Sequence, residues 1–160
     1  MKPFQEESLQ EFNRLYRKYD SICHEIALAA GLSDSAFSIL YYILEEGEGC
    51  SQGEICASIF LTKQTIHSSI RKLEKEGFLT LERDRGRDRR IRLTPAGRKL
   101  AEERILPVME LENAAFRDMD PADRRRLLDL TARYVALFEK RAKEYDRLPA
   151  RRTGEKGETP

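Results

Sequence analysis

The sequence predicts a mainly α-helical fold with one small β-hairpin, and three observations support this prediction. Apolar residues recur every three or four positions over most of the 160 residues, which is the period of an amphipathic helix. This period changes to two only on either side of Gly86, as expected for two paired strands. Glycines, and prolines that follow Thr or Asp, separate the periodic segments at positions typical of helix ends.

Two helices are predicted at the start of the chain, over residues 5–30 and from Ser33 to Gly47. The first has a single apolar stripe and ends at Gly31, since glycine is favoured just after a helix. The second contains the nearly continuous apolar run FSILYYIL, which predicts a core helix buried on most sides. The stripe of the first helix consists of Leu9, Phe12, Leu15, Tyr16, Tyr19, Ile22, Cys23 and Ile26.

Two short helices are predicted next. Ser51 and Glu54 have the spacing of a capping box, in which each side chain accepts a hydrogen bond from the other residue's backbone N–H, so a short helix begins there. Thr62 can cap the next helix, which covers residues 62–76 and ends at Gly77. The face of this second helix that is predicted to be buried consists of Ile66, Ile70 and Leu73.

A β-hairpin is predicted directly after these helices. Leu79 and Leu81 alternate with polar residues, and so do Ile91 and Leu93. The simplest arrangement is an antiparallel pair whose tip is DRGRD. Its four apolar residues face the core, and the arginines of residues 83–90 face water.

Two further helices complete the chain. A Thr-Pro pair at residues 94–95 and an Asp-Pro pair at residues 120–121 each predict a helix start, because proline costs little at the first helical position. The first of these helices should be kinked at Pro107, which removes a backbone hydrogen bond. The second extends to residue 148, and residues 149–160 are predicted to form a disordered tail.

Positive charge is concentrated in the middle of the chain. The whole sequence carries a formal net charge of +1, but Thr62 to Lys99 contains 12 basic and 5 acidic residues and therefore carries +7. The remainder then carries −6. This asymmetry indicates a surface that binds a polyanion, and the alternative is a solvated charged face.

Several function classes are disfavoured by the sequence. It has no glycine-rich phosphate loop and no HExxH or GxSxG motif, so neither an enzyme nor a cofactor is predicted. Cys23 beside His24 lacks zinc-ligand spacing, and no metal is predicted. Cys23, Cys50 and Cys56 form no CxxC pair, and the N-terminus has no apolar secretion segment, which favours a reduced, cytoplasmic protein. The longest apolar run, residues 37–44, is shorter than the roughly 20 residues of a membrane span.

The element order over residues 33–94, three helices and a hairpin, is that of a winged helix-turn-helix. Such a module lays its last helix in the DNA major groove and its hairpin beside it. At 100° per residue, Gln64, Ser68 and Arg71 lie opposite the buried face, and these residue types can contact adenine, phosphate and guanine. Two alternatives remain open: a helix face that is merely solvated, or an arginine-rich surface that binds an acidic protein.

Three segments carry a family resemblance: the helix TKQTIHSSIRKLEKEGFL, the basic DRRIRLT and the TPAG that follows. Together with the long helices at both ends, over residues 5–148, they resemble the MarR family of bacterial transcriptional regulators. The resemblance implies a homodimer that binds a pseudo-palindromic double-stranded DNA operator and represses transcription until a small molecule or an oxidant acts. The implied major-groove residues are Thr62, Gln64, Thr65, Ser68 and Arg71, and the implied minor-groove residues are Arg85, Arg87 and Arg89, since the short wing does not single out one arginine.

The helices outside the DNA-binding segment are predicted to join two chains. Residues 5–30 and 95–148 carry apolar stripes that a winged helix alone has little surface to cover. The alternative is a helical lobe that folds onto its own chain. By resemblance, an effector pocket lies between these helices and the DNA-binding segment, lined by Tyr16, Phe37 and Tyr41 unless these are plain core residues.

Cys23 is a candidate redox-sensing residue, because some MarR-like proteins sense oxidants through a cysteine in the first helix. The alternative is a buried structural thiol, which is the common state of a cysteine on an apolar helix face.

Overall fold

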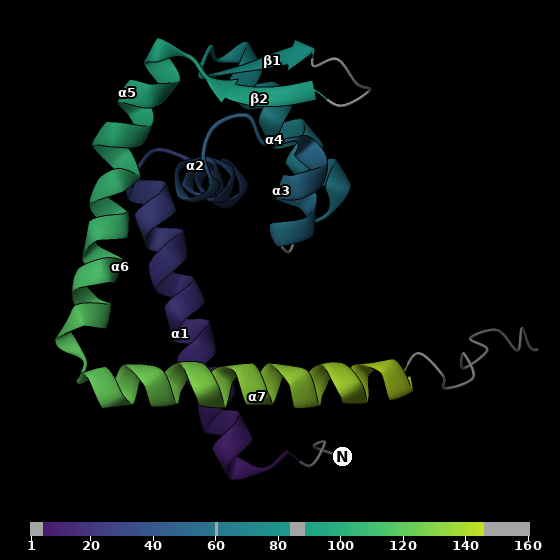
Figure 1. Cartoon of the computed structure of the whole chain (residues 1–160), viewed down its shortest axis with the longest axis vertical. Coiled ribbons are helices and arrows are strands. Elements are labelled where there is room, and N and C mark those ends of the chain that lie inside the picture. The colour runs from purple at the N-terminus through teal and green to yellow at the C-terminus, as the bar shows by residue number, and fades with distance from the viewer. Residues whose placement is uncertain (1–4, 60, 84–88, 146–160) are drawn as a thin grey trace, which may run out of the picture. The chain divides into compact units, whose positions relative to one another are not determined.

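A computed structural model of the chain describes residues 5–59, 61–83 and 89–145. The chain divides into two compact units, Met1–Glu112 and Asn113–Pro160. The described elements are seven helices and two strands, which confirms the predicted fold class (Figure 1). They are α1 (Glu7–Ala29), α2 (Asp34–Glu46), α3 (Gln52–Ser58), α4 (Lys63–Lys75), β1 (Leu79–Arg83), β2 (Arg89–Leu93), α5 (Pro95–Arg104), α6 (Leu106–Asp118) and α7 (Pro121–Tyr145).

The core of the first unit is built around α2. Figure 1 shows this helix end-on, with α3 and α4 on one side and α5 on the other. The prediction of a core helix is confirmed, because Ile39, Leu40 and Ile43 are fully buried. The apolar face of α4 is buried against the same core, as its spacing predicted. The other large, fully buried side chains of this core are Ile55, Ile66, Ile70, Leu73, Leu79, Ile91 and Ile105.

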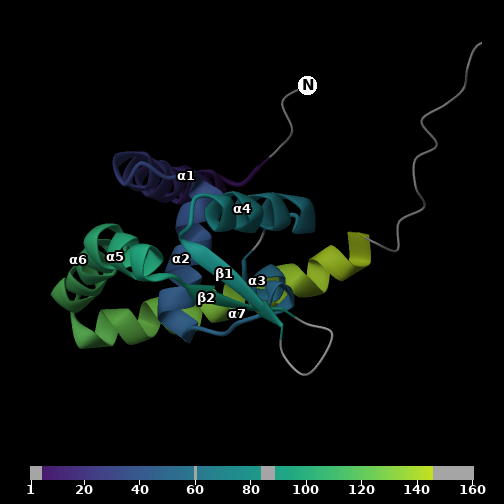
Figure 2. The ribbon, with the colours of Figure 1, turned by 90° about the horizontal axis from the view of Figure 1, so that it is seen from above.

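The predicted hairpin is present and antiparallel. Figure 2 shows β1 and β2 side by side. Leu79 pairs with Leu93, and Leu81 pairs with Ile91, so the two apolar pairs lie on one face of the sheet. Leu79, Ile91 and Leu93 are buried, which anchors the hairpin to α4 and α5.

A third chain segment adds to the edge of β2, which the sequence did not predict. The Gly49 N–H donates to the Ile91 carbonyl, and the Ile91 N–H donates to the Cys50 carbonyl, both at 2.9 Å. Ser51 and Arg90 form an isolated antiparallel bridge next to them. The residues that precede α3 are therefore fixed to the hairpin.

Hydroxyl side chains cap four helices of the first unit. The Ser51 and Glu54 capping box is complete, with the Ser51 N–H donating to Glu54 Oε2 at 2.6 Å and the Glu54 N–H donating to Ser51 Oγ at 3.2 Å. Thr62 Oγ1 accepts from the Thr65 N–H at 3.1 Å, so the predicted cap of α4 is also present. The remaining two caps are Ser33 for α2 and Thr94 for α5.

The glycine of the TPAG segment has a packing role. A Cβ atom on Gly97 would lie 1.9 Å from the Phe78 carbonyl oxygen. The same oxygen accepts a hydrogen bond from the Thr94 N–H at 3.0 Å. Only glycine therefore lets the start of α5 lie this close to the chain that enters β1.

The helix expected to kink at Pro107 is instead two helices, α5 and α6, interrupted at Ile105. Proline has no N–H to donate to the carbonyl of Glu103, four residues earlier, and its ring crowds that carbonyl. The break thus falls two residues before the proline. The second unit contains the end of α6 and α7, and α7 has no buried residue. The predicted tail, residues 149–160, lies outside the described residues.

Taken singly, no described helix is both long and apolar enough to cross a membrane. The helices α1 and α2 reach that length and composition only as a pair, and they are bent by 90° at the break between them.

Candidate nucleic-acid interface

The helix α4 exposes the polar face that the sequence predicted. Gln64, Ser68 and Arg71 are exposed, and Ile66 and Ile70 on the opposite side are buried. The Gln64 side chain makes no hydrogen bond within the described part of the chain. Its amide can therefore both donate to and accept from an external partner.

Hydroxyl groups at the start of α4 are partly used within the helix. Thr62 Oγ1 and Thr65 Oγ1 lie 2.8 Å apart, and Ser68 Oγ donates to the Thr65 carbonyl at 2.9 Å. Thr62 and Thr65 thus stabilise the helix start, while Ser68 retains lone pairs that can accept from a ligand.

A buried hydrogen bond fixes α4 to the core helix. Ser69 is 8% exposed, and its Oγ lies 2.8 Å from Ser35 Oγ near the start of α2. Sequence reasoning missed this contact, because a serine beside an apolar face looks the same whether or not it has a partner.

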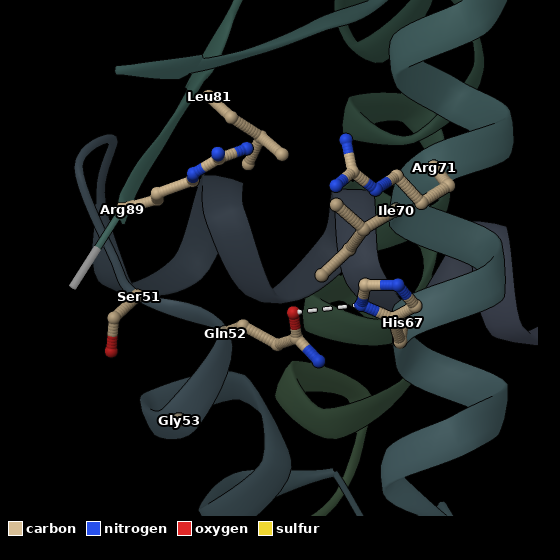
Figure 3. Close-up of a pocket in the computed structure, with 8 residues that line it drawn as sticks. All are labelled: Ser51, Gln52, Gly53, His67, Ile70, Arg71, Leu81 and Arg89. Atoms are coloured by element: carbon tan, nitrogen blue, oxygen red, sulfur yellow. Dashed lines mark hydrogen bonds between the residues drawn. The ribbon is translucent and has the colours of Figure 1, made fainter. Parts of the chain in front are cut away.

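A cavity of about 300 Å³ lies between α3, α4 and the hairpin. Figure 3 shows the Arg71 and Arg89 side chains extending toward one another from α4 and β2, above the Ile70 side chain. Below them, His67 Nδ1 lies 3.4 Å from Gln52 Oε1. Among the described residues that line this cavity, Arg71 and Arg89 carry positive charge and none carries a carboxylate, so we call it the cationic cavity. The lining residues are Ser51, Gln52, Gly53, His67, Ile70, Arg71, Leu81 and Arg89.

Two other arginines of the hairpin, Arg90 and Arg92, form hydrogen bonds within the protein. Arg90 Nη1 donates to the Gly49 carbonyl at 3.2 Å and to Glu54 Oε2 at 3.4 Å. Arg92 Nε donates to Glu82 Oε2 at 2.7 Å. Hydrogen bonds from Ser51, with the nearby Arg90 charge, hold the pKa of Glu54 below its ordinary value. Of the predicted wing arginines, Arg89 therefore lines the cavity, whereas Arg85 and Arg87 lie outside the described residues.

A second cavity, of about 490 Å³, is lined by residues of α1, α2, α6 and the end of α3. The structure brings the predicted effector residues Phe37 and Tyr41 together in its wall but leaves Tyr16 outside. The Tyr16 ring instead stacks on Phe12, with ring centroids 6.5 Å apart. The lining residues are Tyr19, Cys23, Phe37, Ser38, Tyr41, Tyr42, Glu45, Glu46, Ser58, Ile59 and Glu112.

Glu112 connects the aromatic residues of this second cavity. The Tyr41 hydroxyl donates to Glu112 Oε2 at 2.6 Å, and the Tyr19 hydroxyl donates to Glu112 Oε1 at 3.3 Å. Partial burial and the hydrogen bond to Glu112 raise the pKa of Tyr41 well above its ordinary value, so its hydroxyl stays protonated at neutral pH. Sequence reasoning missed Tyr19 and Glu112 as partners, because they are far apart in the chain.

The three cysteines differ in burial. Cys50 is buried, which raises the pKa of its thiol and suits a structural role. Cys23 and Cys56 are partly exposed, and Cys23 lies in the wall of the second cavity. The described residues contain no group of three side chains that could hold a metal ion.

Comparisons with known proteins give a consistent result. Residues 30–91, from the end of α1 into β2, match the model of the MarR family. A search of curated proteins found no match. Among solved structures, a MarR family regulator from Neisseria meningitidis is 20% identical, with a TM-score of 0.76 over 88% of this chain and 99% of that chain.

Two further structures with this fold have named ligands. BpsR of Bordetella bronchiseptica, whose DNA binding is regulated by 6-hydroxynicotinic acid, is 22% identical, with a TM-score of 0.61 over 84% of this chain and 99% of that chain. MarR of Staphylococcus aureus, in complex with salicylate and kanamycin, is 18% identical, with a TM-score of 0.64 over 84% and 91%. At these identities, the likenesses show a shared fold.

Proposed function

We propose that the chain is a DNA-binding, non-enzymatic transcriptional regulator of the MarR family and acts as a homodimer on a pseudo-palindromic operator, because residues 30–91 match the MarR family model and the fold is that of MarR regulators. The observation that carries this proposal is the cationic cavity between α4 and the hairpin. Arg71 and Arg89 enter it from two elements, and none of its described lining residues is acidic. Such a surface fits a DNA backbone that passes between a recognition helix and a wing.

The helix α4 is the recognition helix in this proposal. Gln64 can form two hydrogen bonds with adenine, and Arg71 can form two with guanine, when the exposed face lies in the major groove. Thr62, Thr65 and Ser68 lie toward the start of the helix, where hydroxyls contact phosphates or base edges.

The hairpin is the wing in this proposal. Its arginines neutralise DNA phosphates and do not read bases. Double-stranded DNA carries one negative charge per roughly 1.7 Å of its axis, and each arginine that neutralises a phosphate releases a condensed counterion. We assign this role to Arg89 together with Arg85 and Arg87. It contrasts with Arg90, which donates to Gly49 and Glu54, and with Arg92, which donates to Glu82.

Exposed apolar residues support the dimer. The helices α6 and α7 contain no buried residue, and α1 buries only Ala27. A second copy that covers these faces through a twofold axis places two recognition helices one DNA turn apart, about 34–36 Å. The exposed large apolar residues of α1 and α7 are Phe12, Leu15, Tyr16, Tyr19, Ile22, Leu28, Leu127, Leu128, Leu130, Tyr134, Val135, Leu137, Phe138 and Tyr145.

The dimer represses by occupying its operator in the cytoplasm, and an effector in the second cavity releases it. Two observations support a small-molecule effector: the cavity has a ligand-sized volume, and BpsR of the same fold is regulated by a small molecule. Cys23 lies in the wall of this cavity, so an oxidant that reacts with it would act at the same place.

A salt titration tests the proposed DNA binding. Genomic fragments that the purified protein retains provide the operator, and affinity is then measured from about 50 to 200 mM salt, over which 6–10 phosphate contacts lose about 10³ to 10⁵ in affinity. Polyglutamate serves as a competitor that represents an acidic protein partner. A monomer, retention of no duplex in dilute buffer, or displacement of DNA by polyglutamate at equal charge would contradict the proposal.

A further inference from the structure

We propose that the second cavity, between α1, α2 and α6, binds an organic cation with an aromatic or apolar body. This inference rests on the proposed regulatory function, because it names the chemical class of the effector. It is independent of the DNA contacts of α4 and the hairpin.

The charges that line the cavity are all negative. Glu45 and Glu46 lie at the end of α2, and Glu112 lies on α6. Among the described residues, no Lys, Arg or His lines the cavity, and none of the three carboxylates forms an ion pair. A bound cation would supply the opposite charge that these groups lack, whereas an anion would be repelled by all three.

The walls of the cavity are aromatic. Tyr19, Phe37, Tyr41 and Tyr42 contribute four rings, and the centroids of Phe37 and Tyr41 lie 6.2 Å apart. The negative face of an aromatic ring attracts a cation within about 6 Å of its centroid, and cages of such rings recognise quaternary ammonium groups. Rings and carboxylates together favour a large, weakly hydrated organic cation over a small metal ion.

The position of Glu112 is fixed before a ligand arrives. Both tyrosine hydroxyls donate to it, one to each carboxylate oxygen. Both donors are neutral hydroxyls. Their hydrogen bonds therefore orient the Glu112 carboxylate and leave its negative charge uncompensated. A carboxylate held in this way loses little conformational entropy when a cation binds.

The cavity also contacts the segment that leads to the recognition helix. Ser58 and Ile59, at the end of α3, line it, and the Ser58 hydroxyl donates to the Tyr42 hydroxyl at 3.4 Å. The α4 cap residue Thr62 follows three residues after Ile59. A cation that pushes apart the α2 and α3 walls therefore displaces the start of α4, which links its binding to release of DNA.

Two ions of the same shape and opposite charge test the inference. Isothermal titration calorimetry of the full chain compares tetraphenylphosphonium with tetraphenylborate. We expect the cation to bind at least about tenfold more tightly than the anion. Equal affinities, or tighter binding of tetraphenylborate, would overturn the inference.

Substitutions locate the binding. Glu112→Gln keeps an acceptor for the tyrosine hydroxyls but removes the charge, and it should weaken tetraphenylphosphonium binding about tenfold. Glu102→Gln, on the exposed side of α5, removes the same charge outside the cavity and should have no effect. Should Glu112→Gln fail to fold, Glu46→Gln replaces it. Unchanged binding in the cavity variant would place the cation elsewhere and refute the assignment.

Retention of operator DNA without any added ion distinguishes this inference from the proposed function. A protein that retains DNA but does not discriminate between the two ions refutes only the inference. A protein that retains no DNA refutes the proposed function, and the calorimetric comparison still decides the chemistry of the cavity. When the proposed function and this inference are both correct, tetraphenylphosphonium should lower DNA retention by the wild type. The same ion should lower retention by the Glu112→Gln variant much less.

Discussion

Arg71 Nη1 donates a hydrogen bond to Glu74 Oε2 at 2.8 Å, one turn further along α4. Both side chains are partly exposed, so this ion pair contributes only about 0–1 kcal/mol to stability. Its consequence is orientation, because it holds the guanidinium at the edge of the cationic cavity opposite Arg89. The ion pair must open or be shared when Arg71 contacts a base.

Arg71→Ala should weaken operator binding by about 1–3 kcal/mol and relax the base preference at one position in each half-site. The reason is that a guanidinium reads guanine through two hydrogen bonds that alanine cannot replace. Selection of bound sequences from a randomised duplex pool measures the preference. A uniform loss of affinity over all sequences would show that Arg71 contacts phosphate instead.

Glu74→Gln should have the opposite effect and strengthen operator binding. It removes the carboxylate that competes with DNA for Arg71, and affinity should rise by roughly 0.5 kcal/mol, which lies within the range of exposed ion pairs. Fluorescence anisotropy with the operator measures this change at low salt. Glu102→Gln is the control for net charge, and an equal gain in that variant would attribute the effect to overall charge.

Arg89→Ala should lower affinity and reduce the slope of log affinity against log salt by about 1, because one phosphate contact is lost. Base preferences at the α4 positions should remain unchanged. Lys99→Ala, on an exposed site of α5 where the side chain lies 3.8 Å from Glu103, is the matched control. An unchanged salt slope in Arg89→Ala would show that this arginine makes no phosphate contact.

Gly97→Ala should destabilise the protein by about 1–3 kcal/mol, because the added methyl group overlaps the Phe78 carbonyl and α5 must shift. Urea unfolding at a fixed protein concentration measures the loss. Gly53→Ala is the control, since its Cβ would meet Ser51 Oγ at an ordinary 3.6 Å. Equal midpoints for the two variants would mean that the α5 start adapts without cost.

The sequence predicted the elements whose signals are local. The apolar spacing of Ile66, Ile70 and Leu73 places α4, and the hydroxyl at Thr62 places its start, because both patterns act within a few residues. The alternation around Leu79 and Ile91 likewise predicts the hairpin and the face that it buries.

The missed features are polar contacts between distant residues. Ser35 and Ser69 are 34 residues apart, and Tyr41 and Glu112 are 71 residues apart, so no periodic pattern marks either pair. The second cavity depends on such pairs. The family resemblance led us to expect Phe37 and Tyr41 in it, whereas nothing in the sequence indicated Tyr19 or Glu112. The DNA-binding residues remain a prediction, since a polar helix face has the same pattern whether it meets DNA or water.

The capping box at α3 should make stability depend on pH. Hydrogen bonds from the Ser51 backbone and hydroxyl, and the charge of Arg90, lower the pKa of Glu54 below its ordinary 4.5. A carboxyl whose pKa is lower in the folded state stabilises the protein above its unfolded pKa, and this contribution disappears as pH falls through the folded pKa. Thermal unfolding of wild type and Glu54→Gln from neutral pH to below 4 should therefore converge at acidic pH, with the wild type more stable only above the ordinary pKa. Glu102→Gln should follow the wild type throughout. A constant difference between wild type and Glu54→Gln at all pH values would show that the Glu54 charge contributes nothing to the cap.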